Sequence, residues 1–355
     1  MGAPFGLPEF LALVMLAALV AYALMGGADF GGGLWDLLAF GPRAADQRRL
    51  IEQALAPVWE ANHVWLIFVI VILFSAFPPA FAVLTTALHV PLTLMLVGIV
   101  LRGSAFVFRQ YGAGSVPQVR LWGRVFAIAS VVAPFFLGTV LAAITEGVPV
   151  LPHFGRAAEG AQLLVAGVSW QWTSPFALVV GGFTLALFGY LAAVYLTLES
   201  PDPHLAESFR RRALIAGVVV GEFAFTSLFM ARSQAPLFYA RLLRSWWSWP
   251  LQITTGALAI GALYLLWRRR YRRARVLAVA QAALIVIGWG LAQHPNLIAP
   301  DLTIRSAAAP PAALRVLVPA LVVGGAILLP SLYYLMRIFK TPTVTGGPPS
   351  PPGHG

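Results

Sequence analysis

Cysteine is absent from the 355-residue sequence. Its absence excludes disulfide bonds, thiolate zinc sites and iron–sulfur clusters, and it excludes covalent haem attachment through a Cys-x-x-Cys-His motif. Any redox chemistry in which the chain takes part therefore needs a different set of ligands.

Charged residues are also scarce. They make up 10% of the chain, hydrophobic residues make up 59%, and the mean hydropathy is +0.81. This composition is too apolar for a water-soluble chain of this length and is typical of a polytopic helical membrane protein. The apolar stretches are continuous, whereas the strands of membrane barrels alternate, so the predicted class is all-α.

The apolar stretches are close to the roughly 20 residues that a helix needs to cross about 30 Å of hydrocarbon. The sequence predicts one integral membrane domain over residues 1–340 and a disordered Pro- and Gly-rich tail over residues 341–355. Nine spans are predicted, at residues 8–27, 56–77, 80–101, 121–144, 173–198, 213–231, 250–267, 274–293 and 313–339.

Basic residues are distributed unevenly between the two sides of these spans. Most of the 24 Lys and Arg residues lie in or beside the first, third, fifth and seventh connections and the C-terminal tail. Because these residues favour the cytoplasmic side, the N-terminus is predicted outside and the C-terminus in the cytoplasm. The densest cluster, residues 268–275, joins two spans. We expect it to bind anionic lipid headgroups, and no nucleic-acid partner is predicted.

Motifs of soluble active sites are missing from the sequence. It has no Gly-x-x-x-x-Gly-Lys-Ser/Thr loop and no His-Glu-x-x-His pair, and residues 31–33, a run of three glycines, lack the strand and spacing of a dinucleotide site. Ionisable side chains inside the spans are the remaining candidates, since a charge at the centre of a membrane helix costs about 3 kcal/mol.

Few ionisable residues qualify. Asp29 follows the inner end of the first predicted span, and Glu60 and His63 lie in the first turns of the second, so that the two carboxylates share one cytoplasmic depth. Glu60 and His63 are three residues apart, and Trp59 and His63 are four apart, which places them on one helix face. Chains of carboxylates and histidines conduct protons in membrane proteins. These residues are therefore candidates for a proton relay.

Structural roles are alternatives for the same residues. From position alone, Asp29 and Glu60 are as well explained by an ion pair with Arg102, which is predicted to close the third span, or with another cytoplasmic arginine. Simple snorkelling of the two side chains into the headgroups is a further structural alternative. His89 is predicted inside that span, where a lone histidine more often bonds to a neighbouring helix than to a ligand. Glu222 lies in the middle of the sixth span, where it needs a partner or a proton, or faces a partner subunit.

A b-type haem would need two histidines at matching depth on facing helices. His63 is predicted near the cytoplasmic side and His89 near the middle of the membrane, which disfavours a shared haem. No metal site is predicted in the chain.

Several characteristic strings follow one another along the chain. They are the residues 27–33 (GADFGGG), 56–67 (APVWEANHVWLI), 73–78 (LFSAFP), 101–106 (LRGSAF), 288–295 (GWGLAQHP), 300–304 (PDLTI) and 329–335 (LPSLYYL). In sequence and in order, these strings resemble subunit II of the cytochrome bd quinol oxidases. The resemblance extends from the first predicted span to the last.

The resemblance implies a nine-helix subunit with one peripheral helix and two four-helix bundles, formed by spans two to five and six to nine. It implies a larger partner, subunit I, that holds two haems b and haem d, whereas this chain holds none of them. The chain lacks the Gly-Arg-Gln-Pro-Trp string of subunit I, which agrees with the smaller subunit. Quinol and oxygen are the implied substrates of the complex, and the bacterial inner membrane its location. Membrane lipids, small accessory subunits and a structural quinone are further candidate partners.

The resemblance also implies roles for individual residues. Glu60 matches the acidic residue of a Trp-acidic-x-Asn motif on a cytoplasmic proton path, with Asn62 as its asparagine, and Asp29 matches the second acidic residue of the span-one motif. Gly26 stands where members of the family often have Asp. We therefore expect the path to begin differently in this chain, with His63 as a substitute.

Two other function classes remain open at this point. An ion-coupled secondary transporter acting alone would use Asp29, Glu60 and Glu222 as coupling sites. A purely structural membrane subunit would conduct no protons at all. The resemblance favours a subunit that supports its partner and delivers protons to it.

Overall fold

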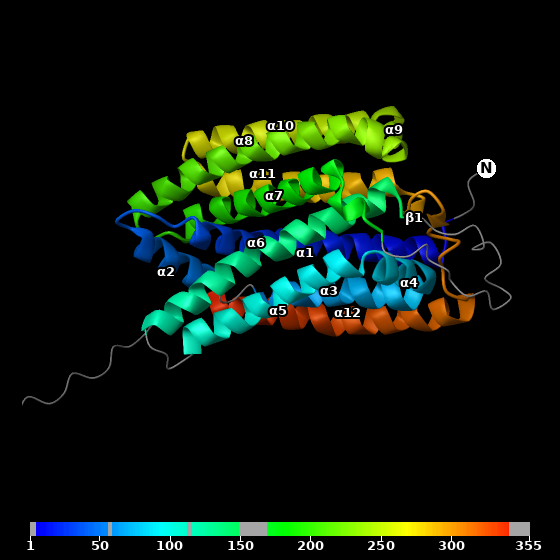
Figure 1. Cartoon of the computed structure of the whole chain (residues 1–355), viewed down its shortest axis with the longest axis horizontal. Coiled ribbons are helices and arrows are strands. Elements are labelled where there is room, and N and C mark those ends of the chain that lie inside the picture. The colour runs from blue at the N-terminus through cyan, green and yellow to red at the C-terminus, as the bar shows by residue number, and fades with distance from the viewer. Residues whose placement is uncertain (1–4, 56–58, 112–115, 149–168, 341–355) are drawn as a thin grey trace, which may run out of the picture.

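The computed structural model describes residues 5–55, 59–111, 116–148 and 169–340, and the predicted tail, residues 341–355, lies outside them. The described residues are almost entirely helical, and the long helices run nearly parallel to one another (Figure 1). The long helices are α1 (Leu7–Leu37), α3 (Trp59–Ala76), α5 (His89–Tyr111), α6 (Val116–Glu146), α7 (Pro175–Glu199), α8 (Pro203–Gln234), α10 (Ser248–Trp267), α11 (Tyr271–Gln293) and α12 (Pro311–Lys340).

Short elements connect the long helices. They are α2 (Ala44–Leu55), α4 (Pro78–Ala87), the 3₁₀ turn η2 (Gln171–Thr173), α9 (Pro236–Arg244) and an antiparallel pair of strands, β1 (Asn296–Ile298) and β2 (Leu302–Thr303). Within the described ranges, eight single helices are long and apolar enough to cross a membrane. The bent pair formed by α3 and α4, whose axes meet at 116°, makes a ninth when it is counted as one span.

Several helix starts follow from local sequence. Proline occupies the first turn of α7 and α8, where the missing N–H has no intrahelical partner in any case. Ser174 caps α7, since its Oγ accepts a hydrogen bond from the N–H of Ala177 at 2.9 Å, and Asp202 caps α8 by accepting from the N–H of His204 at 2.9 Å. Such caps satisfy backbone donors that the helix itself leaves unpaired.

The predicted third span, residues 80–101, is not one helix. The chain breaks at Leu88, and the span is α5. Pro91 explains the break, because a proline ring clashes with the carbonyl group four residues earlier and offers it no hydrogen bond. That carbonyl, on Ala87, instead accepts from the N–H of Ser169 at 2.9 Å. The placement of His89 at mid-membrane was therefore wrong, since it is the exposed first residue of α5.

The first span lies at the centre of the helix packing in this structure, not at its periphery. It packs against α3, α6, α7, α11 and α12 (Figure 1). Its glycines permit this close approach: a Cβ on Gly31 would lie 2.0 Å from the carbonyl oxygen of Phe188 on α7, and one on Gly33 would lie 2.1 Å from Oγ of Ser130 on α6. Small residues allow neighbouring membrane helices to approach closely. The GADFGGG string thus has a packing role.

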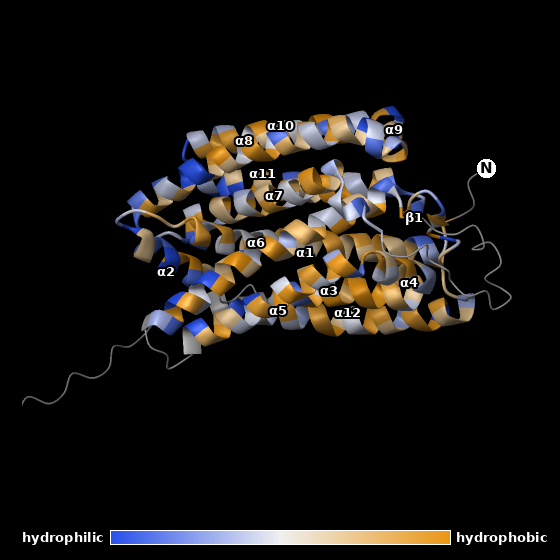
Figure 2. Ribbon diagram, viewed as in Figure 1, coloured by the Kyte–Doolittle hydropathy of each residue, from blue (hydrophilic) through white to orange (hydrophobic). Residues whose placement is uncertain are grey.

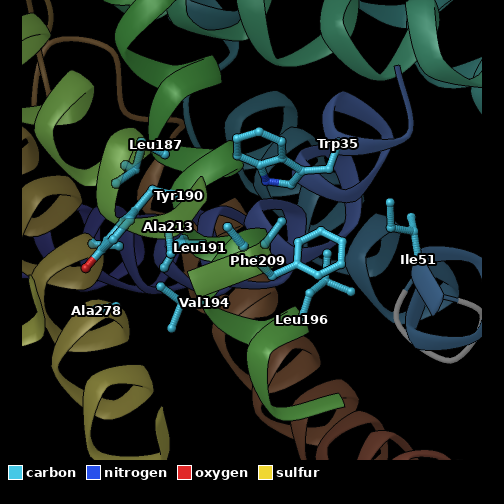
Figure 3. Packing of buried hydrophobic residues seen from close by; sticks show 14 of the residues in the cluster. Trp35, Ile51, Leu187, Tyr190, Leu191, Val194, Leu196, Phe209, Ala213 and Ala278 are labelled. Carbon is cyan, nitrogen blue, oxygen red and sulfur yellow. The ribbon is translucent and has the colours of Figure 1, made fainter. Parts of the chain in front are cut away.

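The largest cluster of buried hydrophobic residues surrounds α7 (Figure 3). Leu191 and Tyr190 of α7 meet Phe209 of α8 and Trp35 of α1 within this cluster. Trp35 also donates a hydrogen bond from Nε1 to the carbonyl oxygen of Gly189 at 2.7 Å. The arginine-rich end of the molecule lies beyond this cluster, where α1, α5, α7 and α10 end (Figure 2).

Candidate functional site

A buried ion pair joins α1 to α5 in the interior. Nη2 of Arg102 donates to Oδ1 of Asp29, and both side chains are almost completely inaccessible to solvent, with 1% and 0% of their surface exposed. Arg102 thus lies well inside α5, about two and a half turns before its end, and not at the end of a span. The guanidinium group neutralises a carboxylate that would otherwise be costly to bury.

Further contacts hold the pair in place. Nε of Arg102 donates to Oγ of Ser130 at 3.1 Å, and its Nη2 also reaches the backbone carbonyl of Asp29 at 3.3 Å. The rings of Phe30 and Phe126 lie 4.9 Å from the guanidinium carbon. Cation–π contacts of this kind are strongest where the cation is desolvated.

Asn62 completes the site from α3. Its Nδ2 donates to Oδ2 of Asp29 at 3.3 Å, and the side chain is fully buried. No donor among the described residues reaches Oδ1 of Asn62. A Cβ on Gly26 would lie 3.3 Å from Asn62 Nδ2. Gly26 therefore borders the site directly.

A second ion pair repeats the first toward the arginine-rich end. Arg109 donates from Nη1 to Oδ2 of Asp36 at 3.1 Å, and Glu52 of α2 and Arg48 lie near the same pair at 3.6 and 3.7 Å. In each pair, the arginine and the aspartate are 73 residues apart in the sequence. Asp29 and Asp36 are two helical turns apart, as are their arginine partners, so α1 and α5 keep one register over about 10 Å.

The sequence analysis missed the second pair and Ser130. Asp36 lies beyond the predicted end of the first span, and Arg109 lies in the predicted connection, so neither was counted as an intramembrane charge. The repeated spacing of seven residues on each helix was the available signal. Seven residues make almost two turns and therefore return to the same helix face.

The predicted relay is only partly visible. The backbones of Trp59 and Glu60 form the first turn of α3, while their side chains lie outside the described part of the chain. His63 is partly buried on the same helix. The structure thus brings Asp29, Arg102 and Asn62 together and leaves the part played by Glu60 a prediction.

Glu222 lies apart from this site. It is exposed near the middle of α8, whereas the ion pair is in the interior between α1, α3, α5 and α6. His89 is also remote from the pair, because it begins α5 thirteen residues before Arg102. Its Nδ1 lies 3.0 Å from the backbone carbonyl oxygen of Thr86. No group of three or more His, Asp or Glu side chains suited to a metal ion occurs among the described residues.

An apolar cavity of about 430 Å³ lies between α1, α3, α5, α6 and α11. Leu16, Leu66, Met95 and Leu137 contribute to its wall. Polar residues line it near β1, among them Gln293, whose Nε2 donates to the carbonyl of Ile144 at 3.3 Å. An apolar wall with few polar groups suits a hydrophobic chain.

Comparison with known proteins decides the family. The family model for cytochrome bd terminal oxidase subunit II matches residues 7–339. The chain belongs to the cytochrome bd subunit II family. As a subunit II, it is part of a bd-type terminal oxidase, a complex that contains haem and has a subunit I. The earlier resemblance is confirmed, and the alternative of a transporter acting alone is excluded.

Relatives of known sequence and structure agree with this assignment. A putative cytochrome bd menaquinol oxidase subunit II of Bacillus subtilis is 27% identical over 330 residues, which cover 90% of this chain and 91% of the relative. A cytochrome bd-I ubiquinol oxidase subunit 2 of Escherichia coli is 27% identical over 191 residues, which cover 53% of this chain and 48% of the relative. A chain of the bd oxidase from Geobacillus thermodenitrificans has a TM-score of 0.72 at 23% identity, covering 94% of this subunit II and 98% of that chain. This likeness shows a shared fold.

Proposed function

We propose that this subunit II is the haem-free half of an inner-membrane quinol oxidase, in which it supports subunit I and carries cytoplasmic protons toward the haems. The buried Asp29–Arg102 pair with Asn62 carries the proposal, because it is an interior polar site built by four helices of one subunit. In this proposal the arginine-rich end faces the cytoplasm, as the positive-inside bias requires.

The supporting role needs a face for subunit I. Helices α3, α5 and α12 lie along one edge of the molecule (Figure 1). They expose large apolar side chains, including Phe74 at 60%, Leu96 at 57% and Ile327 at 65% of their surface. We assign this face to subunit I, since α3 and α5 also contribute Asn62 and Arg102 to the polar site.

The proton path would begin at the first turn of α3 and reach the polar site. Glu60 is two residues before Asn62, and Asn62 contacts Asp29. The oxygen of Asn62 that lacks a donor among the described residues offers an acceptor for a water molecule. Buried polar groups are usually satisfied, and water does so where protein groups do not. The carboxylate of Asp29 is held by Arg102, so its proposed role is to fix the side chain of Asn62 in place while its own side chain stays fixed.

The cofactors of the complex would be two haems b and haem d, held by subunit I, and this chain offers no metal site among its described residues. The apolar cavity fits the hydrophobic tail of a structural quinone, because its wall is formed by side chains such as Leu16, Met95 and Leu137. A quinone held there would serve as a structural element between α1 and α6.

Glu60→Gln in the assembled oxidase tests the path. The change replaces the ionisable carboxyl group by a neutral amide of the same size, so we expect slower quinol oxidation and slower proton uptake at unchanged haem content. Glu199→Gln is the matched control: its side chain is 48% exposed at the end of α7 and lies 3.9 Å from Arg275. Equal turnover of both variants and the wild type would refute the proton path and leave the supporting role.

A further inference from the structure

Glu222 lies at the mid-depth of α8. Residues 213–231 contain no other charged side chain, and Arg212 and Arg232 flank this stretch. Glu222 is ten residues from each arginine, which corresponds to about 15 Å along a helix. This distance is half of the roughly 30 Å hydrocarbon thickness. The carboxyl group is therefore placed where water is scarcest.

The side chain nevertheless points out of this subunit. Glu222 is exposed, and it shares a helix face with Ile215, Val218, Phe225 and Phe229, which are 65%, 64%, 77% and 76% exposed. These five residues recur every three or four positions, and we call them the Glu222 stripe. No hydrogen bond or ion pair links Glu222 to another described residue. An unpaired carboxyl group facing lipid at this depth is costly, so such residues normally pair across an interface.

The surroundings of the stripe leave room for another backbone. Helices α8 and α10 meet near Gly217, where an added Cβ would lie 2.7 Å from Leu263. Farther along, the Cβ positions of Gly221 on α8 and Gly256 on α10 have no atom within 4 Å. Glycines with open space at their Cβ positions permit a neighbouring membrane helix to approach closely.

We propose that a transmembrane helix of a polypeptide other than subunit I packs on the Glu222 stripe and places a positively charged or hydrogen-bond-donating side chain opposite Glu222. Charge complementarity identifies this occupant, because lipid tails offer no donor. A second copy of the chain does not fit, since a symmetric contact through the stripe would bring two Glu222 carboxylates together.

The stripe is also separate from the face assigned to subunit I. Helices α8 and α10 lie along the edge of the molecule opposite α3, α5 and α12 (Figure 1). This part of the inference rests on the proposed function. The two placements are nevertheless tested by different cross-links and can fail independently.

Photo-cross-linking in the oxidase purified from native membranes tests the proposal. With p-benzoylphenylalanine in place of Phe225, we expect an adduct to a polypeptide distinct from subunit I. Mass spectrometry should place the linked residue in a transmembrane helix of that polypeptide, at a position no more than two helical turns from a residue with a basic or hydroxyl side chain. An adduct only to lipid, to subunit I or to a second copy of the chain overturns the proposal. The same probe at Ile67, which is 59% exposed on α3, should capture subunit I, and its failure would count only against the subunit I face.

Glu222→Leu provides the second measurement. Because Glu222 contacts no described residue through a polar bond, its loss should leave the fold of this subunit intact. We expect the Phe225 adduct to fall on the order of three- to thirtyfold, the range set by one interhelical hydrogen bond. Val276→Leu, a substitution at a 65% exposed position on α11, is the control and should leave the yield unchanged. An unchanged yield in Glu222→Leu would show that the carboxyl group does not hold the helix.

Discussion

The Asp29–Arg102 pair allows a quantitative test of what holds α1 inside the molecule. Asp29→Asn preserves the size of the side chain but leaves the guanidinium group of Arg102 buried without a counter-charge. Arg102→Gln does the reverse and leaves the carboxylate of Asp29 with Asn62 as its remaining side-chain donor among the described residues. The double variant contains no buried charge at this site.

The expected magnitudes follow from the contacts that remain. Removing one partner of a buried pair costs about 3–5 kcal/mol. Arg102 in Asp29→Asn keeps Ser130 at 3.1 Å and two aromatic rings at 4.9 Å, so we expect the lower value, about 3 kcal/mol. Asp29 in Arg102→Gln keeps a single 3.3 Å bond from Asn62, so we expect about 5 kcal/mol. The double variant should lose only about 1–2 kcal/mol, because uncharged groups cost less to bury.

Equilibrium unfolding of the purified oxidase in detergent measures these differences. The double-mutant cycle isolates the coupling between the two residues, and a loss of about 3 kcal/mol lowers the ratio of folded to unfolded protein roughly a hundredfold. The two side chains would not act as a pair if the loss in the double variant equalled the sum of the single losses. Haem content, measured on the same samples, shows whether assembly with subunit I depends on the pair.

Two further pairs of variants can be measured in the same assay. Gly31→Ala should destabilise the protein by about 1–3 kcal/mol, because the new methyl group would overlap a carbonyl oxygen of α7. Gly123→Ala is the control and should be neutral or slightly stabilising, because the nearest neighbour of its new methyl group would be 3.9 Å away. Equal effects of the two substitutions would contradict the close packing of α1. Arg109→Ala should lower the stability by about 1–3 kcal/mol, because it leaves the buried carboxylate of Asp36 poorly paired. Arg48→Ala should lower it by less than about 1 kcal/mol, because the Arg48 side chain is 44% exposed. A larger loss in Arg48→Ala than in Arg109→Ala would refute the assigned pairing.

Much of the fold could be predicted because membrane spans are a local property of composition. A run of about 20 apolar residues must form a helix in hydrocarbon, whatever its neighbours are. The predicted span at residues 173–198 therefore agrees with α7 (Pro175–Glu199), and the span at 274–293 agrees with α11 (Tyr271–Gln293). The break before α5 was also readable, since Pro91 lay inside the predicted third span and its effect was not applied.

The site was only partly predictable. Asp29 was named as an ion-pair partner of Arg102 in one alternative and as part of a proton path in another, and sequence alone could not choose between them. Asp36 was not considered, because its importance depends on Arg109, which is 73 residues away. The hairpin of β1 and β2 was also missed, since strands of two or three residues leave no periodic signal.

The sequence by itself determined that this chain is a helical membrane protein of the bd subunit II type, because apolar length and motif order are carried by the chain directly. Only the tertiary structure decided that α1 is central, that Asp29 faces Arg102 and Asn62, and that Glu222 faces outward. These features depend on helix rotation and on contacts between distant residues, as where Gly31 meets α7. Hydropathy contains no information about either, because it measures how apolar a segment is and not which neighbour each side of it meets.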